Sequence, residues 1–586
     1  MNLDIYDLYN AQNNPKNNHL YWSSKVYIKN SLDNILEKNK KKIKIKYLKI
    51  IDEIIEKNKK KNTKFTYKNI NLIDLSLINE KNPYKSKSIY NCLKLLALEN
   101  YLKIKKIKKI YYFGKNKNLD SSINELCYEL NIKYKKKFFF NIQSYKILYF
   151  FKGVLFFIFY LLKNFKKHKQ KKINATVTFF SYFQHLKNNF YFDSAYWSGI
   201  NQILKKNYLS TNWFHFFVPS IKNLKIEDAN KKINLFNLNS KYENHFIINS
   251  YLEFTYLIVI FFNFIRLFVK NIYSINKKFF FLNSNSKTNF KFFMHDDFSR
   301  SIFGDVLLYN LFNIATLDNI IKKIPKQKYG FFLMENQSWE IILLNLWRRY
   351  NHGKIFGFIH STIRFWDLRY FKLKKKLHSI NQNPDKILFN SNFYRKIAIQ
   401  NYYPKKRCEV VEALRYINLK QQNHKKYNNK KILIIGDIDN DENFFLMNKI
   451  SNIYKKINNY LFYYKPHPAN TVKMIFELKK INKKIIFLNN SSQLNYSDFE
   501  AVICSNGTSA TLDCIIKKVK FCTIKSYDAL DLFPLNDDIK SKIQLSTENE
   551  IILFIKKKSF NKKFFVDINL DPSLNNWKKI IQNIKN

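Results

Sequence analysis

The sequence has very little glycine and proline, with only 9 Gly and 10 Pro among 586 residues. Lys, Asn, Ile, Phe and Tyr occupy many positions where Ala, Gly, Arg and Val are more usual, a pattern typical of proteins encoded by AT-rich genomes. Because this bias places Lys at solvated positions along the whole chain, composition alone carries little functional information. The formal net charge of +58 therefore does not by itself identify a nucleic-acid-binding protein.

Recognition motifs for nucleic acid are also missing. The sequence contains no RRM, KH, helix-turn-helix or zinc-finger pattern, and its aromatic residues are not interleaved with a compact basic face. We therefore expect no nucleic-acid partner. The large positive charge still predicts attraction to anionic lipid or to anionic substrates.

The sequence lacks metal-binding spacings as well. Its six cysteines include no CxxC pair, and Cys504, Cys514 and Cys522 have no partner at zinc-like spacing. We expect buried free thiols in a reducing cytosol. The His-Asp-Asp run at 295–297 lacks a further ligand, and the acidic loop at 437–442 lacks the Gly and terminal Glu of a Ca²⁺ loop. We expect this acidic loop to be a solvated cleft rim, and we expect neither a metal ion nor a cofactor.

No apolar run reaches the ~20 residues that a membrane span requires. The two longest candidates are 145–163, which Lys152 interrupts, and 251–269, which contains Arg266. A dense basic run at 163–172 follows the first candidate, and an apolar helix beside a basic cluster is typical of an interfacial anchor. A buried core helix is the alternative. The N-terminal residues show no signal-peptide pattern, so we expect a cytoplasmic protein, peripheral on the inner face of the cytoplasmic membrane.

Strand-like and helix-like patterns alternate along the chain. Residues 1–144 are expected to form an N-terminal α/β module, with a charged helix within the first 70 residues, a strand at 108–114 and a helix at 119–132. The apolar-basic segment 145–172 would be a helical joint. No internal repeat is evident.

Two further regions have the pattern of doubly wound α/β domains, in which apolar strands alternate with helices. The middle region, 173–417, and the C-terminal region, 431–586, are separated by a polar linker. The expected strands of the middle region are 174–182, 290–297, 329–336, 353–362 and 385–391, and residues 408–416 close it. Those of the C-terminal region, which we expect to be Rossmann-like, are 431–437, 460–468, 484–490, 500–507 and 519–524.

The Lys-Pro-His-Pro motif at 465–468 is the strongest local signal. It directly follows a strand, and ligands of open α/β sheets bind at the carboxyl ends of strands. The two prolines fix φ and stiffen the loop. His467 could then donate a hydrogen bond to a phosphate, and Lys465 adds a point charge. We predict a catalytic and nucleotide-binding role for His467; the alternative is an exposed loop.

A second signal lies at the carboxyl end of the strand expected at 500–507. Ser505, Asn506 and Gly507 predict a tight turn, and Thr508 and Ser509 then enter a helix. Free N–H groups and the helix dipole at such a helix start favour a phosphate. Together with the Lys-Pro-His-Pro loop of the same sheet, this turn predicts a cradle for nucleotide phosphates. Ordinary helix capping is the alternative.

The middle region supplies candidates for the acceptor side. Glu335 follows the apolar residues YGFFLM of the strand expected at 329–336 and is a candidate general base, with helix capping as the alternative. His360, at the end of the next strand, is a second candidate base or phosphate contact. Glu340 lies one turn after Glu335, and Arg364 and Trp366 share a loop. Arginine beside an aromatic ring suits a sugar or phosphate ligand, but equally suits a surface stack.

These motifs carry a resemblance to known transferases. The Lys-Pro-His-Pro loop with the Ser-Asn-Gly-Thr-Ser turn resembles the C-terminal domain of GT-B enzymes that use CMP- or CDP-linked donors, such as polysialyltransferases, capsule Kdo transferases and CDP-glycerol glycerophosphotransferases. The middle region resembles bacterial surface carbohydrate biosynthesis proteins. The resembling strings there are EKNPYKS (80–86), ENQSWE (335–340), HSTIRFWDLRY (360–370) and EALRY (412–416).

The resemblance implies a GT-B-like fold, in which two Rossmann-like domains face a cleft, with the N-terminal module added. It implies a metal-independent glycosyltransferase that makes O-antigen or capsule-like surface polysaccharide. The C-terminal domain would bind a nucleotide-sugar donor as substrate, and the middle domain would bind a carbohydrate or lipid-linked acceptor. Catalysis would depend on positioning and on stabilising the leaving phosphate. Two alternatives are a CDP-glycerol-type polyol phosphotransferase and a non-catalytic, membrane-associated scaffold.

Overall fold

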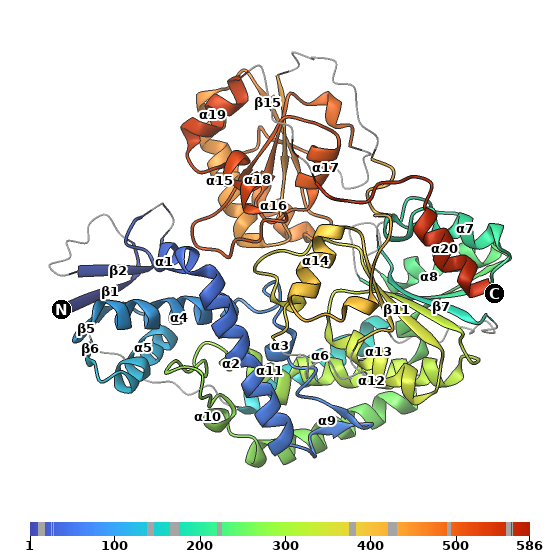
Figure 1. Ribbon diagram of the computed structural model, residues 1–586, viewed down its shortest axis with the longest axis horizontal. Helices are drawn as coiled ribbons and strands as arrows, with labels where there is room; N and C mark the ends of the chain where they lie inside the picture. Colours follow the sequence, from blue (N-terminus) through green and yellow to red (C-terminus); the bar gives the residue numbers. More distant parts are fainter. Residues whose placement is uncertain are drawn as a thin grey trace.

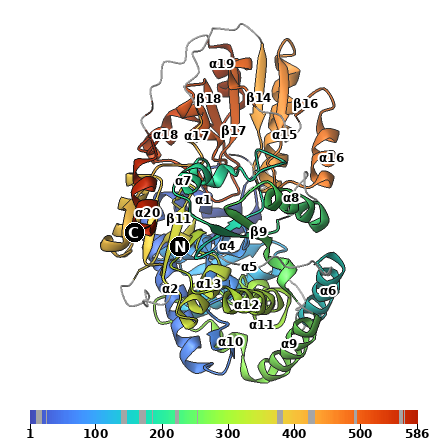
Figure 2. The same ribbon diagram turned by 90° about the vertical axis from the view of Figure 1, so that its right-hand side faces the viewer.

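Three fully parallel β-sheets, each flanked by helices, organise the chain (Figures 1 and 2). The computed structural model of the protein describes residues 1–586 except 10–17, 25, 27, 137–145, 165–174, 185, 219–224, 253, 374–382, 420–429, 489–493, 558–563, 565 and 586. In Figure 1 the N-terminal sheet lies at the left, the middle sheet at the lower right and the C-terminal sheet at the top. The expected α/β class is therefore confirmed.

The C-terminal sheet has the strand order of a Rossmann fold. It runs β16-β15-β14-β17-β18-β19, so its order reverses between β14 and β17. Its strands are β14 (Lys431–Ile435), β15 (Leu461–Lys465), β16 (Ile486–Phe487), β17 (Ala501–Ser505), β18 (Phe521–Ile524) and β19 (Gln544–Leu545). The accompanying helices are α15 (Asn440–Lys456), α16 (Val472–Ile481), α17 (Ala510–Ile516), α18 (Asp537–Ile543) and α19 (Glu548–Lys556). Apolar strands such as β17, buried along their whole length, are what a sheet covered on both faces requires.

The middle sheet repeats this arrangement with one more strand. It runs β13-β12-β11-β10-β7-β8-β9, so its order reverses between β7 and β10. Its strands are β7 (Val177–Tyr182), β8 (Thr211–Phe216), β9 (Glu243–Ile247), β10 (Tyr329–Leu333), β11 (Lys354–Ile359), β12 (Lys386–Phe389) and β13 (Cys408–Val410). Helices α7 (Ile200–Lys206), α8 (Ile226–Leu238), α13 (Ser338–Arg349) and α14 (Asn392–Gln400) accompany it. Two Rossmann-like domains are therefore present, as the resemblance implied.

Three strand assignments in the middle region differ from expectation. Residues 290–297 were expected to be a strand, but they form turns that lead into helix α11 (His295–Phe303). Phe290, Phe293 and Met294 are all buried, and this i, i+3, i+4 spacing is that of a helix face rather than of a strand. Conversely, β8 and β9 were not expected, because polar residues such as His215 and His245 interrupt their apolar pattern.

The N-terminal module shares its core with the middle domain. Its sheet runs β2-β1-β5-β6, and apolar residues of the module belong to one continuous buried cluster with those of the middle domain. Its strands are β1 (Asn2–Leu8), β2 (Asn18–Ser23), β5 (Lys109–Phe113) and β6 (Lys133–Lys136), and a small hairpin adds β3 (Thr66–Tyr67) and β4 (Ile70–Asn71). Its helices are α1 (Leu32–Lys38), α2 (Lys40–Lys61), α3 (Leu77–Glu80), α4 (Ser88–Lys105) and α5 (Lys117–Glu129).

A helical layer lies beneath the middle sheet. Helix α12 (Asp305–Lys323) is buried on nearly all sides and packs against α6 (Lys146–Asn164), α9 (Phe254–Ser274), α11 and α13. The short α10 (Lys277–Phe280) follows α9. Of the expected joint at 145–172, α6 is described, whereas 165–172 lie outside the described residues. So does most of the expected linker at 418–430.

The last helix crosses back to the middle domain. Helix α20 (Asn575–Lys585) belongs by sequence to the expected range 431–586, but it packs on α7 and lies beside the middle domain in Figure 1. Trp577 is buried in the core of the middle sheet and donates from Nε1 to the carbonyl of Glu412 at 3.1 Å. The Glu412 carboxylate accepts from the backbone N–H groups of Asn576 (2.9 Å) and Trp577 (3.2 Å), and so caps the helix.

We expect Trp577→Ala to destabilise the middle domain by about 3–5 kcal/mol, because it removes a buried indole and leaves a cavity under the sheet. Urea denaturation followed by intrinsic fluorescence would measure the loss as a lower midpoint. Truncation of the exposed Tyr273, which is 88% exposed, provides the control. An unchanged midpoint for Trp577→Ala would contradict the docking of α20.

Candidate functional site

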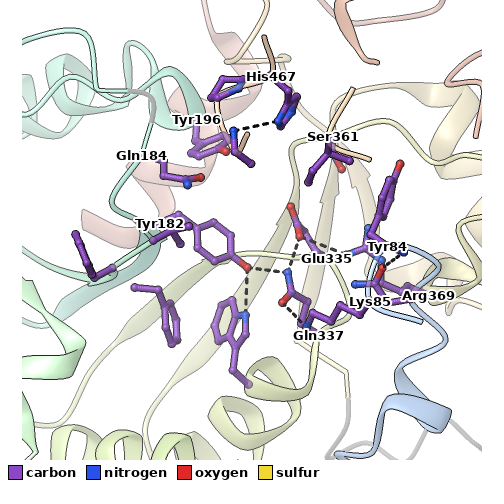
Figure 3. A pocket seen from close by; sticks show the side chains of 18 of the residues that line it. Tyr84, Lys85, Tyr182, Gln184, Tyr196, Glu335, Gln337, Ser361, Arg369 and His467 are labelled. Carbon is purple, nitrogen blue, oxygen red and sulfur yellow. Dashed lines mark hydrogen bonds and ion pairs between the residues drawn. The ribbon is translucent and has the colours of Figure 1, made fainter. Parts of the chain in front are cut away.

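A cavity of about 1500 Å³ lies between the two Rossmann-like domains. The middle domain lines it with residues that follow β7, β8, β9, β10, β11 and β13, and the C-terminal domain with residues that follow β14, β15 and β17. The carboxyl ends of both sheets therefore face the same space, as expected for ligand sites of open α/β sheets. Figure 3 shows the part of this cavity that Glu335, Arg369 and His467 line.

Asp437 follows β14 and Gly436, at the point where the strand order of the C-terminal sheet reverses. Its Oδ2 accepts from the Ser505 hydroxyl at 2.8 Å and from the Gly507 N–H at 3.1 Å. A Cβ on Gly507 would lie 2.7 Å from this same oxygen, so only glycine fits the turn. The acidic loop was expected to be a solvated rim, but Asp437 is only 4% exposed and fixes the turn after β17.

Two predicted nucleotide contacts lie behind the cavity wall. Ser505 is engaged with Asp437, and Asn506 donates to Asp531 at 2.8 Å and accepts from Gln544 at 2.6 Å. Neither Ser505 nor Asn506 lines the cavity, whereas Gly507, Thr508 and Ser509 do. Ser505 and Asn506 are thus placed to brace the turn, because the hydrogen bonds of their side chains are directed into the sheet.

The helix after this turn is short. Helix α17 spans only seven residues, Ala510–Ile516, so its dipole is small compared with that of a long helix. The Ser509 hydroxyl accepts from Arg364 at 3.0 Å, and the Thr508 hydroxyl oxygen accepts from the Ala510 N–H at 3.3 Å. Anion binding here therefore depends on side-chain cations more than on the helix start that the sequence suggested.

His467 is held in one orientation by its own loop. Its backbone N–H donates to Asn470 Oδ1 at 2.8 Å, and Asn470 donates to the Asp437 carbonyl at 3.2 Å. The His467 ring accepts from the Ala469 N–H at Nδ1, 3.2 Å away. Burial, together with nearby Arg415 and Arg364, lowers its pKa. The neutral ring therefore carries its proton on Nε2, where it is a hydrogen-bond donor.

Two cationic side chains of the cavity, those of Lys465 and Arg415, make no hydrogen bond and no ion pair in the described part of the chain. Asp513 lines the same cavity, and its charge acts on both of them without direct contact. Burial lowers the pKa of Lys465, while Asp513 opposes that shift. Half-buried cations without a direct ion pair are stabilised when an anion joins them, so this pair can bind an anionic ligand.

Arg415 was not among the predicted site residues, although it lies within the EALRY string. The sequence has only nine arginines against 93 lysines, and all nine lie between positions 266 and 415. Four of them, namely Arg300, Arg364, Arg369 and Arg415, line the cavity. In a sequence so rich in lysine, the rarity of arginine is therefore the feature that could have pointed to Arg415 as a site residue.

Arg364 joins the two faces of the cleft. Its Nη2 donates to the Gly507 carbonyl at 2.9 Å and to the Ser509 hydroxyl at 3.0 Å. Its buried Nε has no hydrogen-bond partner among the described residues, and its guanidinium lies over the Tyr84 ring with 5.8 Å to the centroid. The middle domain thus contacts the donor-side turn directly, and part of the Arg364 fork is still available to a ligand.

Glu335 is the centre of a polar cluster on the opposite face. Its Oε2 accepts from Gln337 at 2.6 Å and lies 3.4 Å from Arg369 Nη1, and its Oε1 lies 3.5 Å from His360 Nε2 (Figure 3). Burial alone would raise the pKa of Glu335, but Arg369, His360 and Gln337 together hold it below its ordinary value. Glu335 is therefore an ionised carboxylate at neutral pH.

His360 lies beside Glu335, 3.5 Å from its carboxylate. Its side chain is only 2% exposed, and burial lowers its pKa to about 4, with a further contribution from Arg415. Its Nδ1 has no hydrogen-bond partner among the described residues. A neutral imidazole here can donate a hydrogen bond from Nε2 to Glu335 without changing the net charge of the cluster.

Two acceptor-side candidates have structural roles instead. The Glu340 carboxylate accepts from the backbone N–H groups of Glu335 (2.8 Å), Asn336 (3.0 Å) and Gln337 (3.2 Å), and so forms the capping box of α13. Trp366 is buried and donates to Glu37 of α1 at 3.3 Å, which fastens the loop to the N-terminal module. Neither side chain lines the cavity.

The N-terminal module contributes residues that the sequence reasoning missed. Tyr84 lines the cavity and lies between the guanidinium groups of Arg364 and Arg369. Lys85 pairs with Glu80 at 2.7 Å and donates to Gln337 at 3.3 Å. Both belong to the EKNPYKS string, for which the sequence pattern predicted no strand end and hence no place at a ligand site.

The His-Asp-Asp run at 295–297 is used in packing. Asp296 accepts from the Tyr149 hydroxyl at 2.9 Å, His295 lies 3.1 Å from Lys277, and Asp297 accepts from Ser86. Within the described ranges, no group of three or more His, Cys, Asp or Glu residues could hold a metal ion.

No protein-family model matches the sequence, and no curated protein matches it either. Solved structures similar to the chain include the UDP-N-acetylglucosamine 2-epimerases of Rickettsia bellii (12% identity, TM-score 0.40) and Neisseria meningitidis (10%, 0.36) and a trehalose-6-phosphate synthase, OtsA (11%, 0.33). Each covers 70% of this chain and 96%, 98% and 99%, respectively, of its own. With TM-scores below 0.5, the fold assignment rests on the strand orders of this chain itself.

The buried His360 predicts a pH dependence of stability. Its pKa of about 4 lies below the ordinary value of 6.5, so between these values the unfolded chain binds more protons than the folded chain. Stability should therefore fall as the pH drops from 6.5 toward 4, by up to about 1.4 kcal/mol per pH unit for this one group.

Urea midpoints measured near pH 7 and pH 5.5 test this expectation. His360→Gln should flatten the dependence, whatever its effect on absolute stability, and His19→Gln on β2 is the control outside the cavity. An equally steep dependence in His360→Gln and in the wild type would contradict a neutral, buried His360.

Proposed function

We propose that the protein is a GT-B-type glycosyltransferase that transfers a sugar from a nucleotide-activated donor to a hydroxyl group of an acceptor. The observation that carries this proposal is the pairing of two groups in one cavity between Rossmann-like domains. The first group is Lys465 and Arg415, two cations without a direct ion pair among the described residues. The second is Glu335, an ionised carboxylate just after β10.

The donor phosphate would occupy the side formed by the C-terminal domain. Lys465 supplies positive charge there, Arg415 adds to it from the middle domain, and His467 supplies a neutral N–H donor. As the bond between the anomeric carbon and the phosphate oxygen breaks, negative charge grows on the leaving phosphate. Preorganised donors and cations in a partly closed cavity stabilise such charge more than water does.

The acceptor would occupy the side formed by the middle domain. Glu335 takes the proton from the acceptor hydroxyl as its oxygen forms the new bond to the anomeric carbon. Arg369, which makes two hydrogen bonds of 2.8 Å to Asp367, keeps Glu335 ionised and in place. The leaving phosphate needs no proton, so atoms and charges balance without a further reactant.

We further propose that the donor is CMP- or CDP-linked and that the product is a bacterial surface polysaccharide, with the acceptor either carbohydrate or lipid-linked. The Lys-Pro-His-Pro loop and the turn after β17 support the cytidine donor through their resemblance to cytidine-dependent transferases. The cations Lys465 and Arg415 support catalysis without a metal ion, since they already neutralise two phosphate charges. A polyol phosphotransferase would use the same anion site, and its product would carry the donor's phosphate.

Cytidine nucleotides should bind the cavity and stabilise the protein more than uridine or guanosine nucleotides do. Ligand at ~100 times its dissociation constant should add roughly 2.7 kcal/mol of stability. Thermal-shift titrations with CMP, CDP, UDP and GDP measure this. Arg415→Ala and Lys465→Ala should each weaken binding roughly tenfold or more, because each removes a charge-assisted contact.

Lys473→Ala, on the exposed first turn of α16, is the matched control and should bind as the wild type does. If no nucleotide shifts the melting temperature, the transferase proposal is wrong and the scaffold alternative gains. Equal shifts with all four nucleotides would keep the cavity as a nucleotide site but remove the cytidine preference.

Glu335→Gln should lower turnover by roughly 10²–10⁴-fold, because it removes the general base. Nucleotide affinity should change far less than turnover, since the Glu335 carboxylate is held by Gln337 and Arg369 and makes no ion pair with Lys465 or Arg415 in the described chain. Donor consumption measured with the purified full chain gives turnover, and the thermal-shift titration gives affinity.

Glu340→Gln is the companion variant. It weakens the cap of α13, so it should lower stability while turnover per folded molecule is retained. Full turnover in Glu335→Gln would exclude its role as base.

A further inference from the structure

Helices α6 and α9 form one surface at the edge of the helical layer. They lie side by side at the lower right of Figure 2, and ring contacts join Phe150 to Phe268 (4.4 Å between centroids) and Phe157 to Phe261 (4.7 Å). These pairs run in opposite sequence directions, so the helices are antiparallel. Their inner faces pack on the protein, as the stacking of Tyr160 on Phe312 of α12 at 4.2 Å illustrates.

The outer faces of both helices are apolar and exposed. We call this surface the α6–α9 face. Its most prominent side chains, each 49–65% exposed, are Phe151, Leu155 and Phe159 on α6 and Val259, Phe262 and Val269 on α9. Soluble proteins seldom expose large contiguous apolar patches, and those that do usually bind something there.

Basic residues accompany this apolar surface, and acidic residues are missing from it. Lys152 of α6 and Arg266 and Lys270 of α9 are exposed, and neither helix sequence contains Asp or Glu. The basic run at 163–172 overlaps the end of α6. Long cationic side chains can lay their stems along apolar surface and keep their charges at the level of lipid phosphates.

We propose that the α6–α9 face docks in the plane of an anionic lipid bilayer. Its apolar side chains enter the boundary between headgroups and acyl chains, and its cations pair with lipid phosphates. The sequence pointed to the first of these helices only; the structure places α9 beside it and so roughly doubles the surface.

Two other occupants fit less well. Helix α9 is long and apolar enough to span a membrane over Thr255–Ser274, but Leu257, Ile260 and Phe264 are buried against the protein, so spanning would tear it from the core. A second copy of the chain would bring the same cations face to face in a two-fold contact, on a molecule of net charge +58.

Docking on this face also orients the cleft. The cavity wall includes Phe156 and Tyr160 of α6, so only this helix, about 10 Å in diameter, would separate the cavity from the bilayer surface. An acceptor anchored in the membrane would then reach the middle-domain side of the cavity from its own surface, a consequence that rests on the proposed function.

Co-sedimentation with vesicles tests the docking without nucleotide or acceptor, so it is independent of the transferase proposal. The wild type should bind phosphatidylcholine vesicles that contain phosphatidylglycerol, bind pure phosphatidylcholine less, and release partly at high salt. The double variant Phe151→Gln/Phe262→Gln should bind at least roughly tenfold more weakly, because two exposed rings no longer insert.

The control is Phe476→Gln on α16, where the ring is 59% exposed on the C-terminal domain; it should bind as the wild type does. Thermal melting of all variants confirms that they fold. Equal vesicle binding by the double variant and the wild type would overturn the proposal. So would a concentration-dependent dimer that the double variant abolishes, since the face would then be covered by a second copy.

Discussion

The turn after β17 is fixed by a single carboxylate, and both faces of the cleft depend on that turn. Asp437, at the end of β14, accepts from Ser505 and from the Gly507 N–H. The Gly507 carbonyl in turn accepts from Arg364 of the middle domain. A few hydrogen bonds, at the point where the strand order of the C-terminal sheet reverses, therefore connect the two Rossmann-like domains. Lys465 and His467 lie one strand away from this point, on the loop that Asn470 ties to the Asp437 carbonyl.

The parts of the fold that the sequence predicted are those in which local pattern and buried position agree. Strands β14, β17 and β18 of the C-terminal region are largely apolar and buried, because helices cover both faces of the sheet. The loops after β15 and β17 could be placed at the carboxyl edge of one sheet for the same reason. Glu335 and His360 could each be named as candidates because both lie at strand ends, and the pairing of β10 with β11 then brings them together.

Other features follow from tertiary contacts that no local pattern contains. His215 and His245 interrupt the apolar pattern of β8 and β9, yet they lie 3.1 Å apart in the core, where each satisfies the other. Glu340 carries the same chemistry as Glu335, and only the fold shows that its oxygens are used by three backbone N–H groups. Trp366 was expected to stack on a ligand, but its side chain is buried and donates to Glu37 of α1, which is more than 300 residues away in sequence.

The distribution of arginine connects the composition with the site. The sequence has 93 lysines against nine arginines. Lysine therefore supplies most of the positive surface charge, and the exact position of each surface lysine matters little. Arginine offers a planar fork that lysine cannot replace, and the cleft uses that geometry. Arg369 binds Asp367 with two parallel hydrogen bonds while it reaches Glu335, and Arg364 binds Gly507 and Ser509 through one nitrogen. Arg415 alone, among the four in the cavity, has neither an acidic nor a carbonyl partner in the described chain. Its fork could therefore make a two-point contact with a phosphate group, which replacement by lysine would remove while keeping the charge.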